Sequence, residues 1–139
     1  MIGISGAKHA SSPLTRHLQE ARNNTVPGLL CLRAKERPHK VVYRYKDLGI
    51  YHELTWSRLQ ERVENVCLGL VALGLRKGDR VAIMGDTCIE WVLSDLGAQA
   101  LGGIVYGVYP TSSPSEVLYL MENGGARVFV AENQEHLDK

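Results

Sequence analysis

The stretch RVAIMGDTCIEWVLSDLGAQALGGIVYGVY, residues 80–109, decides the fold. It opens and closes with short runs, RVAIM and GIVYGVY, that are apolar almost throughout, which is typical of strands buried on both faces of a parallel sheet. Between them, from about Thr87 to Leu101, apolar residues recur at steps of three and four, the spacing of one helix face. A strand, a helix and a second strand in this order predict a β-α-β unit with a right-handed crossover.

The same alternation continues toward the C-terminus. A helix is expected from Pro114 to about Asn123, a third buried strand in ARVFVAE, and the start of one more helix in NQEHLDK. Lys139 is expected to fall inside that last helix. With only three parallel strands predicted, we expect the chain to be a piece of a larger protein.

Toward the N-terminus the pattern predicts two helices with a hairpin between them. The first helix is expected to begin at Thr25 and to end before Pro38, and the second to be capped by Thr55 and stopped by Gly74. The hairpin is expected to turn at 47–49. The predicted fold class is therefore α/β: an N-terminal hairpin and helices, followed by β-α-β-α-β units on a parallel sheet.

Composition and charge limit the class of protein and the partners to be expected. The chain is 45% hydrophobic and 22% charged, typical of a soluble globular protein, and its formal net charge of +1 does not indicate nucleic acid as a partner. Three widely spaced cysteines without a C-x-x-C pair favour a reducing compartment, which predicts a cytoplasmic location. Residues 1–24 are predicted to be a poorly ordered tail. Because 1–19 are free of acidic residues, a mitochondrial transit peptide is the alternative.

The segment GVYPTSSPSEV, residues 107–117, has the hydroxyl-rich composition of a phosphate loop. Such a loop needs glycines whose N–H groups converge on the anion, followed by a lysine. YPTSSPSE contains neither and has two prolines. We therefore interpret Ser113, Pro114 and Glu116 as a helix start with a capping box, and we expect a second capping box at 87–90. The five histidines are scattered, and the sequence predicts neither a metal site nor a catalytic residue.

In their order, TVPGLLCLRAKERPHKV, GDRVAI, EW, GGIVYGVYPTSSPSEV and GARVFVAE resemble the N-terminus of the AMP-forming acyl-CoA synthetases (adenylate-forming superfamily), especially long-chain fatty-acid–CoA ligases. The resemblance runs from about Thr25 to the last residue. It implies a parent ligase that converts ATP, a fatty acid and CoA to acyl-CoA, AMP and pyrophosphate with Mg²⁺. It also implies that 25–139 are an incomplete N-terminal subdomain, truncated before the ATP phosphate loop. We therefore expect the chain alone to bind no cofactor and to be inactive.

The resemblance carries few residue roles. The segment after the GVYP-type strand lies near the acyl or CoA channel in related synthetases, which implies a channel wall formed by Tyr109, Pro110, Thr111 and Ser112. Leu137 stands where some acetate-type relatives carry a CoA-contacting arginine, so that contact is not assumed. Gly28 and Arg58 stand where relatives often carry the glutamate of a capping box, which should weaken both helix starts.

The resemblance also implies partners: the remainder of the synthetase, fatty acid and CoA as substrates of the parent, a peripheral membrane contact and a homo-oligomer, with no nucleic acid. Two other interpretations stay open. One is a non-catalytic interaction or oligomerisation module that pairs through an exposed sheet edge. The other is an independent Rossmann-like nucleotide binder, which the missing G-x-G-x-x-G after each strand disfavours.

Overall fold

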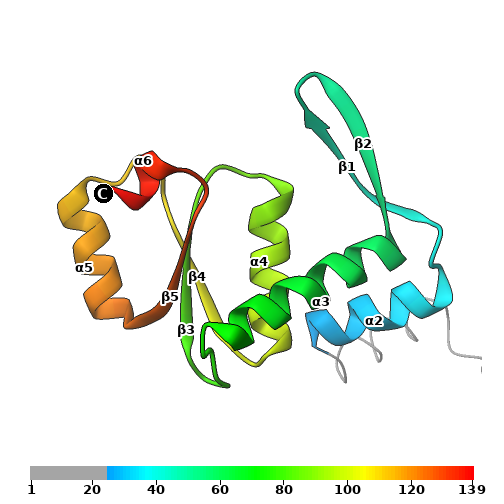
Figure 1. The fold of residues 1–139 in the computed structure, drawn as a ribbon, viewed down its shortest axis with the longest axis horizontal. Helices are drawn as coiled ribbons and strands as arrows, with labels where there is room; N and C mark the ends of the chain where they lie inside the picture. Colours follow the sequence, from blue (N-terminus) through cyan, green and yellow to red (C-terminus); the bar gives the residue numbers. More distant parts are fainter. Residues whose placement is uncertain (1–24) are drawn as a thin grey trace, which may run out of the picture.

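The structure is a computed structural model that describes residues 25–139; the predicted tail lies outside the described residues. Within residues 25–139, ten elements follow one another in the order expected from the sequence (Figure 1). They are α2 (Val26–Glu36), β1 (Val41–Asp47), β2 (Ile50–Thr55), α3 (Trp56–Ala72), β3 (Arg80–Met84), α4 (Ile89–Ala100), β4 (Ile104–Val108), α5 (Pro114–Gly124), β5 (Ala126–Ala131) and α6 (Gln134–Leu137).

A three-stranded parallel sheet with the order β4-β3-β5 forms the centre of the fold. Its central strand is buried on both faces, as its apolar sequence predicts. Val81 and Ile83 pack in one cluster with residues of α3 and α4, whereas Ala82 and Met84 pack against α5. The two crossover helices therefore cover opposite faces of the sheet, as Figure 1 shows. This confirms the predicted fold class.

The two-stranded antiparallel sheet of β1 and β2 is the expected hairpin, and it leans away from the rest of the molecule (Figure 1). Its turn residues Leu48 and Gly49 have φ angles of 45° and 85°, the two positive values that a type I′ hairpin turn requires. At the base of the hairpin, Leu54 is buried in a cluster with residues of α2, α3 and α4. The hairpin is thus anchored through its base.

Most helix ends are where the sequence places them. The hydroxyls of Thr25 and Thr55 accept from the N–H groups of Gly28 and Arg58, and neither helix has an acidic residue in its first turn. Each of these two helix starts therefore has the hydroxyl half of a capping box without the carboxylate half, as expected. At the end of α3, Gly74 has a φ of 82°; its own N–H donates to the carbonyl of Val71, and the N–H of Leu75 donates to that of Leu70. This is a Schellman stop.

The capping box predicted for 87–90 is wrong. Helix α4 begins one residue later than a box at Thr87 requires, with Cys88 as an N-cap that makes no side-chain hydrogen bond to the helix. The Glu90 carboxylate accepts instead from the Arg62 guanidinium at 3.3 Å. The prediction for Lys139 is also wrong: α6 ends at Leu137, and Lys139 follows the helix, donating from Nζ to the carbonyl of Pro110.

Candidate functional site at the carboxyl ends of the strands

The carboxyl ends of the three parallel strands lie at one edge of the sheet. Met84 of β3 is in register with Val108 of β4 and with Ala131 of β5. The loops that follow these strands therefore begin side by side, and the first two lead to helices on opposite faces. Crevices outside the carboxyl ends of the strands are where open α/β sheets bind ligands, so this edge is the candidate site.

The predicted channel-wall residues begin at this edge. Tyr109 is 79% exposed, and the N–H of Ser112 bonds to its carbonyl at 3.0 Å, which closes a tight turn. Tyr109 and Pro110 border a cavity of about 510 Å³, whose other lining residues are Gly85, Asp86, Thr87, Trp91, Gly107 and Val108. Thr111 and Ser112 are not among the described residues that line it. The structure thus brings two of the four predicted residues to a cavity.

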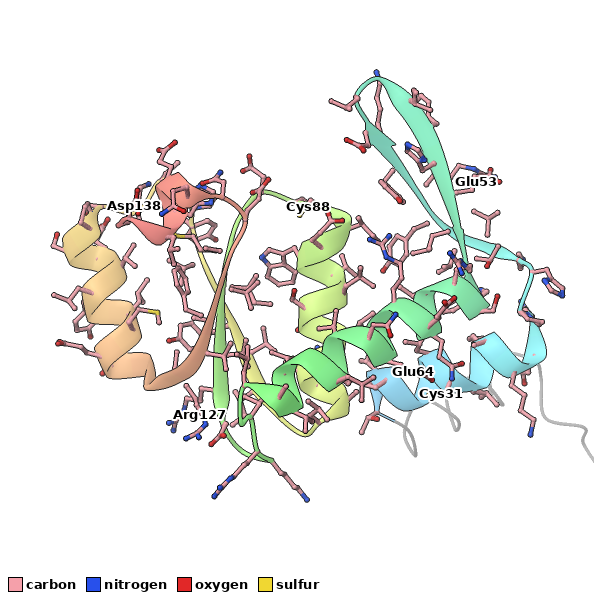
Figure 2. The ribbon with its side chains drawn as sticks, viewed as in Figure 1. Cys31, Glu53, Glu64, Cys88, Arg127 and Asp138 are labelled. Carbon is pink, nitrogen blue, oxygen red and sulfur yellow. The ribbon has the colours of Figure 1, made fainter. Side chains whose placement is uncertain are left out.

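The turn after β3 is the part of this edge that the sequence did not single out. Glu132, the first residue after β5, extends its carboxylate to the backbone N–H of Asp86, with an Oε2–N distance of 2.6 Å. Gly85 leaves room for it, because a Cβ there would lie 2.9 Å from Cβ of Glu132. A second cavity of about 360 Å³, lined by the ends of β3 and β5 and by the start of α4, reaches from this contact to Cys88 and Trp91. Figure 2 shows Cys88 at the same end of the sheet, where α4 begins.

The residues after β4 form a helix start, as predicted. The backbone N–H of Ser113 donates to Oε2 of Glu116 at 2.7 Å, and the Ser113 hydroxyl accepts from the backbone N–H of Glu116. Both halves of the capping box are therefore present. The hydrogen bond from the Ser113 N–H, and then the one from its hydroxyl, hold the pKa of Glu116 below its usual value of 4.5.

This lowered pKa predicts how stability depends on pH. A carboxyl whose pKa is lower in the folded state stabilises the fold fully above its unfolded pKa, and that contribution is lost as the pH falls through the folded pKa. We expect Glu116→Gln to be less stable than the wild type by a constant amount above pH 4.5. The difference should shrink below that pH, as the wild-type carboxylate is protonated. Urea unfolding followed by circular dichroism across the acid range measures it, and a difference that does not change with pH would contradict the assignment.

Several backbone groups of the loops at this edge are already engaged or have no N–H. Pro110 and Pro114 have no N–H, and the N–H groups of Ser112 and Ser113 bond to the carbonyl of Tyr109 and to Glu116. The N–H of Asp86 is occupied by Glu132. Within 25–139, no group of three or more His, Cys, Asp or Glu side chains is arranged to hold a metal ion.

The family model described as AMP-binding enzyme matches residues 32–139. A long-chain-fatty-acid–CoA ligase of Mycobacterium bovis is 28% identical over 114 residues, which are 82% of this chain and 19% of that protein. An uncharacterised protein of Mycobacterium tuberculosis is 36% identical over 81 residues, which are 58% of this chain and 46% of that protein. The chain therefore spans about a fifth of the length of the ligase.

Among solved structures, a fatty acid AMP ligase from Legionella pneumophila superimposes with a TM-score of 0.71. The match covers 81% of this chain and 20% of that one, with 19% sequence identity. At this identity the likeness concerns the fold alone. It matches the α/β arrangement of helices around a parallel sheet that the sequence predicts.

Proposed function

The chain belongs to the family of AMP-binding enzymes, and from this premise we propose that it is the N-terminal part of a long-chain fatty-acid–CoA ligase. The observation that carries the proposal is the family match over residues 32–139, together with the similarity to the Mycobacterium bovis ligase over most of this chain. The parent would join a fatty acid to CoA with ATP and Mg²⁺, releasing AMP and pyrophosphate. The remainder of the synthetase would be the principal partner.

In this proposal, 25–139 are an incomplete subdomain that supplies scaffold and one wall of the acyl or CoA passage. The exposed ring of Tyr109 and the adjoining Pro110 border the cavity at the carboxyl edge of the sheet, which supports a wall there. Thr111 and Ser112 would extend that wall. The N–H groups of Asp86, Ser112 and Ser113 are already engaged, so we expect the phosphates of ATP to be held by another part of the parent.

The isolated chain is expected to be inactive. Purified chain, incubated with a long-chain fatty acid, ATP and Mg²⁺, should show no ATP–pyrophosphate exchange above a blank without protein. A complete long-chain ligase assayed in parallel is the positive control. Robust, fatty-acid-dependent exchange by the chain would overturn the assignment of a scaffold role.

Sequencing the transcript past the codon of Lys139 tests directly whether the chain is part of a longer ligase. We expect the reading frame to continue into a Gly/Ser/Thr-rich loop that ends in lysine.

A second candidate is a short interaction or oligomerisation module derived from such an enzyme. It is favoured by the Mycobacterium tuberculosis relative, because an 81-residue match makes up 46% of that protein. Strands β4 and β5 are the two edges of the sheet, and an exposed edge can pair with another chain. Light scattering after size exclusion distinguishes the candidates: a defined dimer favours the module, whereas concentration-dependent aggregation favours a part of a larger enzyme.

We also propose a cytoplasmic location with peripheral contact to membranes, since long-chain fatty acids partition into bilayers. None of the helices in the described part of the chain is long and apolar enough to cross a membrane. The transit-peptide alternative concerns residues that lie outside the described part. Imaging of the complete chain with a C-terminal fluorescent tag tests the location, and import into mitochondria would overturn the cytoplasmic proposal.

A further inference from the structure

Four cationic residues gather at the amino end of the parallel sheet, opposite the candidate site. Arg76 and Lys77 are exposed in the turn before β3, Arg80 begins β3, and Arg127 lies near the start of β5. Figure 2 shows Arg127 at this end and Cys88 at the other. The formal charge of the whole chain is only +1. Four of the sixteen Lys and Arg residues thus lie at this end of the sheet, and together they are called the basic end.

Hydrogen bonds hold the basic end together. Nε of Arg127 donates to the carbonyl of Gly74 at 3.0 Å and lies 3.3 Å from Oδ2 of Asp79. The same carboxylate accepts from the backbone N–H of Arg76 at 2.8 Å. Among the described residues, Asp79 is the only carboxylate within ion-pair distance of any of the four cations. The basic end therefore keeps a net positive charge and a fixed shape.

Exposed aliphatic side chains adjoin the basic end. Leu68 and Val71 lie in the last turns of α3, Leu73 is its C-cap, and Ile104 is the register neighbour of Arg80 in the sheet. These four side chains are 53–69% exposed. From Asn65 to Leu75 the sequence contains no charged residue. No described part of the chain covers these aliphatic groups, so within 25–139 they form a mixed apolar and cationic surface with the basic end.

We propose that the basic end and these four aliphatic residues form a contact surface for an anionic lipid bilayer. Arginine and lysine near such a surface are attracted to the phosphate headgroups, and adjacent aliphatic side chains gain free energy by entering the acyl boundary. A single-stranded nucleic acid would call for aromatic side chains on which bases stack, and the surface has none. Charge complementarity and exposed aliphatic area together favour the bilayer.

The orientation that follows suits the candidate site. The strands run from the basic end to the cavity edge, so a bilayer in contact with Arg76 and Lys77 leaves the loop at Tyr109 facing away. The inference deepens the proposed membrane contact and rests on the proposed function only in that respect. Its test contains neither ATP nor fatty acid, so its failure is distinct from a failure of the exchange assay.

Vesicle flotation with the complete chain tests the proposal. The chain should float with phosphatidylcholine vesicles that contain phosphatidylglycerol and not with phosphatidylcholine alone. Each basic residue near an anionic surface contributes about a fivefold factor in binding, so the double variant Arg76→Glu/Lys77→Glu should bind about 25-fold more weakly or worse. The matched control is Lys35→Glu/Lys40→Glu, the same charge change on exposed residues of another part of the molecule. It should stay within about twofold of the wild type.

The aliphatic part is tested separately with Leu73→Ser, which keeps all charges. Its binding should fall about tenfold if the side chain enters the bilayer, whereas the salt dependence should stay that of the wild type. Circular dichroism confirms that each variant is folded. Equal flotation with neutral vesicles, or equal binding of the two charge variants, would overturn the proposal. Binding of a single-stranded oligonucleotide without flotation would assign the surface to nucleic acid instead.

Discussion

Replacing Leu59 by alanine is expected to lower the free energy of unfolding by about 2–5 kcal/mol. Leu59 is 2% exposed and lies in one cluster with Leu30 of α2, Leu54 of β2, and Leu93 and Leu96 of α4. Its side chain therefore fills the point where three helices and the base of the hairpin meet. Because these elements are held from several sides, they cannot collapse into the space that the smaller residue leaves. Urea unfolding followed by far-ultraviolet circular dichroism measures the loss.

Two further variants separate packing from hydrophobicity. Leu59→Met keeps the volume and should cost less than about 1.5 kcal/mol. Leu118→Ala removes the same atoms from an exposed position of α5 and should change stability by no more than about 0.5 kcal/mol. A loss below about 1 kcal/mol for Leu59→Ala would mean that α2 and the hairpin are not packed against α4 in solution.

Local patterns predicted the elements because their causes are local. The caps at Thr25, Thr55 and Ser113 each join a side-chain oxygen to an N–H three residues later, a contact that depends on almost nothing else. The failure at Thr87 has a cause distant in the sequence. Glu132 holds the N–H of Asp86, and Arg62 draws away the carboxylate that would have closed the box. Residues far along the chain decided where α4 begins.

The candidate site was predicted only in part, for a similar reason. Tyr109 and Pro110 follow a recognisable buried strand, so their position at a strand end is readable from the sequence. Their neighbours around the cavity come from the turn 85–87 and from Trp91, and no periodicity says that these two loops adjoin. The strand order β4-β3-β5 determines it. A right-handed crossover predicts which face a helix covers, but it does not determine which strands become neighbours.

The basic end likewise could not be predicted from the sequence, because its residues come together only in the fold. Arg76 and Lys77 are adjacent in the sequence, but Arg127 is about fifty residues away and reaches them through the carbonyl of Gly74. A net charge of +1 conceals this gathering, because fifteen acidic residues nearly balance the sixteen basic ones in the whole sequence. Net charge therefore argued against an electrostatic partner that the folded surface supports.

Replacing Gly97 by valine is expected to lower the free energy of unfolding by about 3 kcal/mol. Gly97 lies in α4 where this helix crosses α3, and a Cβ there would lie 2.7 Å from Cγ1 and 3.1 Å from Cβ of Val66. Val66 is β-branched and stiff at χ1, so it cannot turn aside. The thiol of Cys67 also donates to the Gly97 carbonyl at 3.4 Å, a contact that separation of the helices would break.

Gly69→Val is the matched control, because Gly69 lies within α3 and a Cβ there would meet nothing within 4 Å. Intrinsic helix propensity favours valine over glycine by a few tenths of a kcal/mol, so this variant should unfold within about 0.5 kcal/mol of the wild type. The same substitution in two helices then differs only in what the new side chain meets. Equal losses at the two positions would show that helix propensity decides the effect, and the close approach of α3 and α4 would be contradicted.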